Sequence, residues 1–418
     1  MLGVIWRRLN RCLLAGLVAY VAFLLSLIAE PVQRALIYLH PIRIPFGTDF
    51  SRPELVGFAP GKVLPFNLTT QDGAVLGAWQ VLPRDVYERA IEASGEVTFP
   101  DGPLAQSVFD DALVDPQRPT VVYFHGNAAT RAAGNRVRTA RHLTDLGANF
   151  LIIDYRGFAD SSRSPPPSEE GLLTDARTAW DYLHLEKRVR PEQIAIMGQS
   201  LGTGVSAGLA GRLAREDIHP RAVVLVAPFS SIASLLETYK LGNIVPLLSP
   251  LRAFPPLLNY LLRLLKTRFD THGIIETIRA PILILHAHND PVIPLSHSRT
   301  LTDRLLEPLL SPPMTGSEGS GEQEAQREGA ESAQPRRLGR DEHVSEVKVG
   351  GWGTVSRFER GNGFGEVVWA EAWKGAHNEI GTHEYSIELV RRMLFPSETA
   401  RDAARTAARP DRQRAEPV

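Results

Sequence analysis

Gly198-Gln199-Ser200-Leu201-Gly202 directly follows the apolar run Ile194–Met197 and opens a helical pattern. A nucleophile on such a tight strand-to-helix turn holds strained backbone angles, which bring the residues two before and two after it close together. Both of those residues must be small, as Gly198 and Gly202 are. The stretch therefore predicts a serine nucleophile at Ser200 between two elbow glycines.

A second match to the same pattern, Gly204-Val205-Ser206-Ala207-Gly208, comes only six residues later. It lies inside the helical pattern that Ser200 opens, where a serine hydroxyl bonds back to the helix or packs. We interpret Ser206 as a small packing residue.

Short, nearly all-apolar runs alternate with helical patterns along much of the chain. Parallel strands that are buried on both faces are expected to be continuously apolar. The runs are Thr120–Phe124, Phe150–Asp154, Ile194–Met197, Ala222–Val226 and Ile282–His286, and the helical patterns are Ala133–Leu146, Glu169–Leu185, Val205–Arg215 and Ser296–Leu310. Upstream, Val63–Thr69 and Ala74–Val81 flank a turn signal and predict an antiparallel hairpin. The alternation predicts an α/β fold with a doubly wound, mostly parallel sheet.

A serine hydroxyl needs a base, and the base needs a third group that fixes its tautomer. In folds that carry this turn, the acid and then the histidine follow the serine along the chain. Asp290 comes just past the strand Ile282–His286, at the kind of strand end where active sites of parallel sheets gather. His377 follows the β-rich run Val367–Ala372 and is the candidate base. His383 is the alternative, but it stands at the start of a helical pattern.

The loop His125-Gly126-Asn127-Ala128 follows the predicted strand Thr120–Phe124. A backbone N–H from this loop would pair with the N–H of Leu201 to stabilise an oxyanion. Asn127 is the preferred donor in the loop, and Ala128 is the alternative.

A competing interpretation is a metal site at His286-Ala287-His288-Asn289-Asp290, whose two histidines share one strand face. A binuclear metallohydrolase would need another histidine directly after the aspartate, where this chain has Pro291. We therefore expect no metal and no organic cofactor. The single cysteine, Cys12, excludes an intrachain disulfide and a cysteine-based zinc site.

Residues 12–29 form an uncharged apolar stretch of about 18 residues, long enough to cross a thin bilayer as a helix. Arg7, Arg8 and Arg11 precede it, which favours a cytosolic segment 1–11 and a translocated body, that is, a single-pass type II protein. A cleaved signal peptide is disfavoured because the stretch is long and Leu27-Ile28-Ala29 is a poor cleavage site. A buried core helix is the third possibility.

The rest of the chain divides by composition. Residues 30–61 form a membrane-proximal segment, and residues 62–396 suffice for one α/β domain. Within it, the apolar segment 229–275 is interpreted as a lid, whereas segment 311–343 is too polar to bury a core and is predicted to be disordered, as is the tail 397–418. The balance of 46 basic and 47 acidic residues argues against nucleic-acid binding.

Taken together, the motifs resemble those of a known superfamily, and they occur in its order: Tyr123–Asn127, Ile153–Gly157, Gly198–Gly202, His286–Pro294 and Gly375–Asn378. The chain looks like an α/β-hydrolase, and it most resembles the membrane-anchored abhydrolase-domain serine hydrolases that act as monoacylglycerol and lysophosphatidylserine lipases in the endoplasmic reticulum. The resemblance implies the triad Ser200, Asp290 and His377, ester hydrolysis, and a lumenal catalytic body. The 87 residues from Asp290 to His377 exceed the family's usual interval, which we attribute to the insertion at 311–343.

These observations predict a membrane-anchored serine hydrolase that takes a lipid ester, a monoacylglycerol or lysophospholipid, from the bilayer. One alternative is an acyl-protein thioesterase, which would need its body in the cytosol. The other is a non-catalytic, membrane-tethered module that retains the fold.

Overall fold

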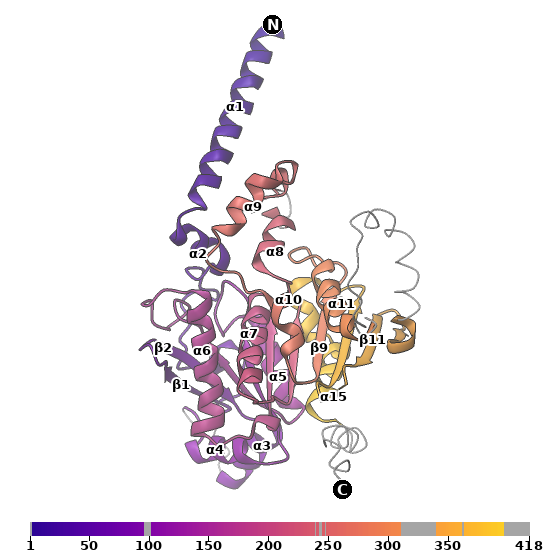
Figure 1. The fold of residues 1–418 in the computed structure, drawn as a ribbon. Helices are drawn as coiled ribbons and strands as arrows, with labels where there is room; N and C mark the ends of the chain where they lie inside the picture. Colours follow the sequence, from indigo (N-terminus) through magenta and orange to yellow (C-terminus); the bar gives the residue numbers. More distant parts are fainter. Residues whose placement is uncertain are drawn as a thin grey trace, which may run out of the picture.

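The computed structural model describes residues 2–95, 102–238, 240–241, 245–246, 248–310, 340–361 and 363–396. Within these residues, ten strands form one sheet in the order β1-β2-β4-β3-β5-β6-β9-β12-β11-β10 (Figure 1). The strands are β1 Val63–Thr69, β2 Val75–Val81, β3 Thr120–Phe124, β4 Asn149–Ile153, β5 Ile194–Gln199, β6 Ala222–Val226, β9 Ile282–Ala287, β10 Ser345–Val349, β11 Gly353–Glu359 and β12 Glu366–Ala372. A separate two-stranded ribbon pairs β7 Lys240–Leu241 with β8 Val245–Pro246.

The six central strands, β4 to β12 in the sheet order, are parallel. All the apolar runs singled out above are strands, and their bounds agree to within two residues with those expected. Every residue of β3, β4, β5, β6 and β9 is buried, which explains why these strands lack an alternating pattern. The predicted α/β fold with a mostly parallel sheet is therefore confirmed.

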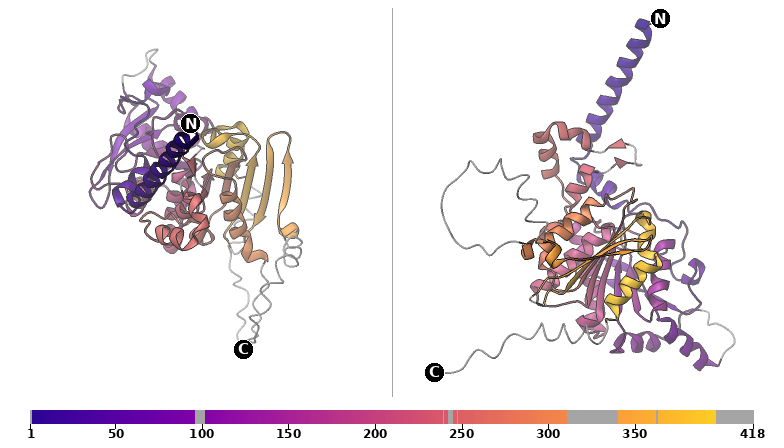
Figure 2. Two further views of the ribbon diagram at one scale, coloured as in Figure 1. Left: turned by 90° about the horizontal axis from the view of Figure 1, so that it is seen from above. Right: turned by 90° about the vertical axis from the view of Figure 1, so that its right-hand side faces the viewer.

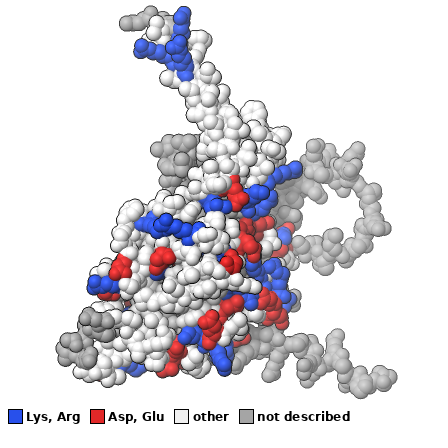
Figure 3. Space-filling model, turned by 90° about the vertical axis from the view of Figure 1, so that its left-hand side faces the viewer, with Lys and Arg blue, Asp and Glu red and all other residues white. Residues whose placement is uncertain are grey.

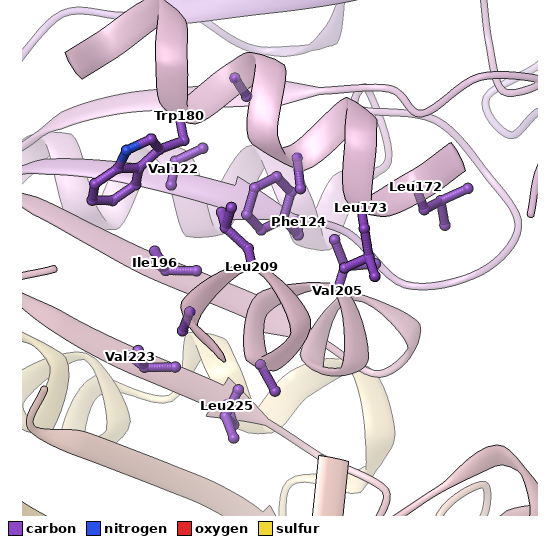
Figure 4. Close-up of a cluster of buried hydrophobic side chains, with 14 of the residues drawn as sticks. Val122, Phe124, Leu172, Leu173, Trp180, Ile196, Val205, Leu209, Val223 and Leu225 are labelled. Atoms are coloured by element: carbon purple, nitrogen blue, oxygen red, sulfur yellow. The ribbon is translucent and has the colours of Figure 1, made fainter. Parts of the chain in front are cut away.

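Helices cover both faces of the sheet (Figure 2). One face packs against α6 Glu169–Asp181, α7 Leu201–Arg215 and α11 Ser296–Leu310, and the other against α5 Gly134–Asp145 and α15 Glu384–Leu394. Successive strand side chains point to opposite faces, so that Val122 and Phe124 join the first cluster whereas Val121 and Tyr123 join the second. Figure 4 shows the first cluster, in which Val205 and Leu209 of α7 face the strands.

Antiparallel hairpins extend the sheet at both edges. The hairpin β1–β2 is the one that the sequence predicts, with Val63 opposite Val81 and Thr69 opposite Val75. At the other edge, β10 and β11 form a hairpin that sequence analysis missed. Most of β10 is exposed, so it lacks the apolar run that marked the central strands. The hairpin accounts for part of the long interval between Asp290 and His377, which the sequence attributes to the insertion alone.

The N-terminal helix α1 Leu2–Ser26 projects from one end of the body (Figure 1). Its segment Val4–Ser26 is long and apolar enough to cross a membrane, and only 6% of its most apolar window is buried in the protein. The helix begins before the predicted span 12–29 and ends three residues earlier. A short second helix, α2 Glu30–Tyr38, follows it in the membrane-proximal segment.

Further short helices complete the body. In the region 229–275, α8 Ile232–Thr238 and α9 Pro255–Arg263 lie at the end of the body from which α1 emerges, whereas α10 Thr271–Ile274 packs beside α7. The helices α3 Arg84–Ser94 and α4 Gln106–Val114, which sequence analysis missed, lie at the opposite end. Of the two segments predicted to be disordered, 311–339 and 397–418 lie outside the described residues, and residues 340–343 form a helical turn.

The turn between β5 and α7 depends on one close approach to the neighbouring strand. A Cβ on Gly202 would lie 1.9 Å from the carbonyl oxygen of Phe124, at the end of β3. A Cβ on Gly198 would lie 2.2 Å from the Gly202 carbonyl oxygen. Only glycine fits either position, because the obstructing atoms belong to the backbone.

We expect Gly202→Ala to lower the free energy of unfolding by at least about 3 kcal/mol, because β3 and α7 must separate to admit the methyl group. Gly211→Ala, on the same helix, is the matched control: its Cβ would meet nothing closer than 3.6 Å. Removing a helical glycine there should raise stability by up to about 1 kcal/mol. Chemical denaturation of both variants measures the difference, and equal stabilities would contradict the clash.

Candidate active site

Ser200 is the single residue between β5 and α7. Its backbone angles, φ 53° and ψ −121°, are rare for residues other than glycine. Its backbone N–H donates to the Val226 carbonyl at 3.0 Å, which ties the turn to the end of β6. The residue is 8% exposed. A strained serine at a strand end is the arrangement that presents a hydroxyl to a substrate.

Ser206 lies inside α7 and is fully buried. Its hydroxyl has no hydrogen-bond partner among the described residues and points toward Gly198, whose hypothetical Cβ would lie 2.4 Å from it. The structure thus separates the two serines: Ser200 lines a cavity and Ser206 packs between elements.

The structure brings Asp290 and His377 together although 87 residues separate them: His377 Nδ1 lies 2.8 Å from Asp290 Oδ2. Asp290 follows β9, and His377 lies on the short helix α14 Ala376–Glu379 that follows β12. The Asn289 side chain accepts a hydrogen bond from the Ala376 N–H at 2.9 Å, which joins the two loops a second time.

The histidine loop is also bound to the nucleophile turn. Gln199, the residue before Ser200, donates from Nε2 to the His377 carbonyl at 3.0 Å. The Gln199 Oε1 atom accepts hydrogen bonds from the Tyr123 hydroxyl at 3.0 Å and the Asn135 amide at 3.1 Å. Gln199 therefore fixes the positions of the serine and histidine loops relative to β3 and α5. His383, by contrast, lies at the N-terminus of α15 and packs against Gly375.

Asp290 is fully buried and accepts hydrogen bonds on both oxygens. Oδ1 accepts from the backbone N–H groups of Val292 at 2.8 Å and Ile293 at 2.9 Å, and His286 Nε2 lies 3.4 Å from Oδ2. Burial by itself raises the pKa of Asp290, but the interactions with His286 and His377 and the backbone N–H of Ile293 outweigh it and hold the pKa well below its usual range. The carboxylate stays ionised and can orient a histidine.

The two histidines of the competing metal interpretation, His286 and His288, contact different partners. His286 Nε2 lies 2.9 Å from the Ile293 carbonyl, beside Asp290. His288 is partly exposed and lies against Trp373, with ring centroids 4.7 Å apart, and 3.8 Å from Glu371. In the part of the chain that the structure describes, no three metal-ligating side chains gather.

The loop after β3 lies against the nucleophile, since a Cβ on Gly126 would be 3.2 Å from that of Ser200. The Ala128 N–H donates to the Tyr38 carbonyl at 3.0 Å and is thereby occupied. Asn127 and Leu201 line the same cavity as Ser200. The geometry thus favours Asn127 over Ala128 as the loop donor of an oxyanion site.

Residues that sequence analysis did not single out hold this loop in place. The N–H groups of Ala129 and Thr130 donate to the carbonyls of Ile42 at 2.7 Å and Ile44 at 3.0 Å. From the opposite side, Arg136 Nη2 donates to the carbonyls of Gly126 at 3.2 Å and Ala128 at 2.8 Å. Backbone-to-backbone bonds leave no side-chain pattern, so the role of segment 37–44 has no signal in the sequence.

An apolar cavity of about 130 Å³ lies above Ser200. Besides Ser200, Leu201 and Asn127, its lining comes from the turn that follows α1, from α2 and the residue after it, and from the region 229–275. It consists of Leu27, Ile28, Gln33, Leu36, Ile37, Leu39, Phe229, Ile232, Leu235, Leu236, Leu248, Leu261, Leu262, Leu264 and Leu265. Among the described residues, none that lines the cavity is charged. The cavity is therefore suited to a hydrocarbon chain.

Two side chains of α2 fasten the region 229–275 over this cavity. Gln33 donates from Nε2 to the Leu264 carbonyl at 3.1 Å and accepts from the Lys266 N–H at 3.0 Å. The Tyr38 hydroxyl hydrogen-bonds that of Thr267 at 2.9 Å in a buried position. The roof of the cavity and α2 thus form one packed unit.

The low pKa of Asp290 predicts a pH-dependent stability. An aspartate in the unfolded chain has a pKa of about 3.9. Because the pKa of Asp290 is lower in the folded protein, its ionised carboxylate stabilises the fold at neutral pH. This stabilisation is lost as the pH falls below about 4. We expect Asp290→Asn to lower the melting temperature at pH 7, with a gap to wild type that narrows in acid. Asp111→Asn, at an exposed position on α4, should show no such gap. A gap that remains constant down to pH 3 would contradict the ionised state.

Comparisons with known proteins agree with this fold and with the family that the motifs resemble. A family model described as "alpha/beta hydrolase fold" matches residues 119–243. Lysophosphatidylserine lipase ABHD12 of Rattus norvegicus is 31% identical over 302 residues, which cover 71% of this chain and 70% of that protein. Protein ABHD12B of Homo sapiens is 32% identical over 274 residues, which cover 65% of this chain and 69% of that one.

Solved structures are similar to this chain as well. The crystal structure of an alpha-beta hydrolase from Vibrio vulnificus matches with a TM-score of 0.47 and 18% identity, covering 74% of this chain and 94% of that chain. The level of identity to the curated relatives, sustained over more than two thirds of their length, is what establishes kinship. The chain belongs to the abhydrolase-domain family of the α/β-hydrolase superfamily and is a hydrolase.

Proposed function

We propose that the protein is a membrane-anchored serine hydrolase that cleaves the carboxylic ester of a monoacylglycerol or lysophospholipid through Ser200, Asp290 and His377. The observation that carries the proposal is the apolar cavity lined by Ser200, next to a histidine loop that is bonded to a buried carboxylate. The relatives named lysophosphatidylserine lipase support the choice of a lipid ester.

In the proposed mechanism, His377 takes the proton of the Ser200 hydroxyl while Oγ attacks the acyl carbonyl. The negative charge on the carbonyl oxygen is stabilised by the N–H groups of Asn127 and Leu201. Collapse expels the glycerol oxygen, which takes the proton from His377, and leaves an acyl-enzyme. Water then attacks the acyl-enzyme with His377 again as base, releasing a fatty acid. No step calls for a metal or an organic cofactor.

The region 229–275 serves in this proposal as a lid that receives the acyl chain from the bilayer. Its leucines pack against the last turns of α1, so the cavity lies where the anchor meets the body. The side chains of Phe254, Leu257 and Tyr260 on and beside α9 are exposed at this end, as expected for a surface that meets lipid. An acyl chain would enter the cavity without crossing water.

The covalent step is tested with a fluorophosphonate probe, which labels activated serines. We expect wild type to be labelled, Ser200→Ala to lose labelling and to lose roughly 10⁴-fold or more in ester hydrolysis, and Ser206→Ala to retain both. Ser206 is the matched control because it lies on the same helix in the second copy of the motif. Labelling that survives in Ser200→Ala would overturn the assignment, and an unlabelled wild type would favour a non-catalytic module.

For the orientation, we propose a cytosolic N-terminus and a lumenal body in the endoplasmic reticulum, as a single-pass type II protein. Figure 3 shows basic side chains at the free end of α1 and again where it meets the body, with an uncharged stretch between. Arg7, Arg8 and Arg11 carry the first group, and positive charge near the start of a span favours the cytosolic side.

Protease protection in sealed microsomes tests this orientation. The body should resist added protease until detergent opens the vesicles, whereas a tag placed before α1 should be cleaved at once. Digestion of the body in intact microsomes would instead support a cytosolic enzyme, the orientation that an acyl-protein thioesterase requires.

A further inference from the structure

The structure has a second cavity, of about 410 Å³. It is lined by His40, Pro41 and Arg43, just beyond α2, and by Gly157 and Arg163 of the loop that follows β4. Both loops lie near the end of the body from which α1 emerges, where Figure 3 shows Lys and Arg side chains grouped below the helix. The two cavities share one stretch of chain, since Leu39 lines the apolar one and His40, the next residue, lines the second.

The charges around this second cavity are uncompensated. Arg43 and Arg163 form no ion pair with any residue that the structure describes, and the cavity lining contains no acidic side chain. The nearby buried arginines differ in this respect: Arg131 is paired with Asp154 at 2.7 Å, and Arg156 with Asp175 at 2.7 Å. The cavity therefore presents free guanidinium groups in the part of the protein closest to the anchor.

His40 also lines this cavity. Its Nδ1 is buried and has no hydrogen-bond partner among the described residues. Burial, together with the charges of Arg34 and Arg43, lowers the pKa of His40. An anion bound in the cavity would meet the positive charges of Arg43 and Arg163.

The apolar cavity cannot hold the charged end of a lysophospholipid. The polar residues in its described lining are Gln33, Asn127 and Ser200, and an ion transferred into such surroundings without a counter-charge is strongly destabilised. If the ester carbonyl reaches Ser200 and the acyl chain fills the apolar cavity, the headgroup must lie outside it. The second cavity is the place that offers it positive charge.

We infer that the cavity formed by His40, Arg43 and Arg163 binds the phosphate of the substrate's headgroup while the acyl chain occupies the apolar cavity. The inference rests on the proposed function and narrows it to lysophospholipids with an anionic headgroup. A planar guanidinium donates two parallel hydrogen bonds to phosphate oxygens, which suits Arg43 and Arg163 to this role. Phosphate and ester are joined through one glycerol, so the two sites must lie close together. This requirement agrees with the lining of the two cavities by the consecutive residues Leu39 and His40.

The test uses the full-length protein in micelles of a neutral detergent, which contain no other phosphate. The double variant Arg43→Gln with Arg163→Gln is compared with wild type on lysophosphatidylserine and on a monoacylglycerol of the same acyl chain. We expect kcat/KM to fall about tenfold or more for lysophosphatidylserine and to change less than about twofold for the monoacylglycerol. Fluorophosphonate labelling of Ser200 should be unchanged.

A matched control removes two arginines at the opposite end of the body. Arg84 and Arg89 are exposed on α3, where each pairs with an acid one turn away, and their double glutamine variant should leave both substrates unaffected. An equal loss on both substrates by the Arg43 and Arg163 variant, or no loss on either, would overturn the inference.

A phosphate of a bilayer lipid is the other possible source of the same ligand chemistry. In that case the variant would bind more weakly to vesicles containing phosphatidylserine and hydrolyse both substrates there equally slowly, while keeping wild-type selectivity in micelles; this outcome contradicts a substrate site. Absence of labelling in wild type would reject the proposed function itself, whereas normal labelling without a change in selectivity rejects only the headgroup site.

Discussion

The α-carbon of Gly202 rests against the carbonyl oxygen of Phe124, and the candidate site is arranged around this contact. It sets how closely α7 approaches β3, and therefore where the turn at Ser200 lies relative to the loop that begins one residue after Phe124. That loop carries Gly126 and Asn127. A single backbone approach thus determines the distance from the serine to the candidate oxyanion donor, and a residue with a side chain at this point would displace both.

The acid and the histidine depend on a different constraint, the parallel pairing of β9 with β12. His286 lies opposite Glu371 and Ala287 opposite Ala372, so the chain leaves both strands at the same level of the sheet. Asp290 and His377 then need only short loops to meet. The chain between β9 and β12 can be long because neither loop position depends on its length. This explains how an extra hairpin is accommodated inside the interval.

The sequence alone suffices to predict the central strands, most of the flanking helices and the turn at Ser200, because continuous apolar runs and small residues at fixed spacing follow directly from burial and close packing. It does not suffice for β10, whose exposed positions lack an apolar run, or for β11, whose buried positions include the polar residues Thr354 and Ser356. Nor does it distinguish Asn127 from Ala128, since the choice depends on a carbonyl, that of Tyr38, which any residue would supply. The positions of Gln199 and Arg136 in the site likewise depend on tertiary contacts between distant segments.

The hydrogen bonds that join residues 37–44 to the loop after β3 limit how much of the N-terminal part of this chain could be replaced. The stretch after α1 resembles a linker in position, yet it forms an edge of the candidate active site and, through Gln33, supports the roof of the cavity. The junction between the N-terminal helix and the body therefore lies no later than Leu27, the first residue that lines the cavity. An exchange of this helix for a different one would preserve the lining only if the new helix ended before Leu27, and one that replaced residues up to 45 would also remove the carbonyls that bind the loop after β3.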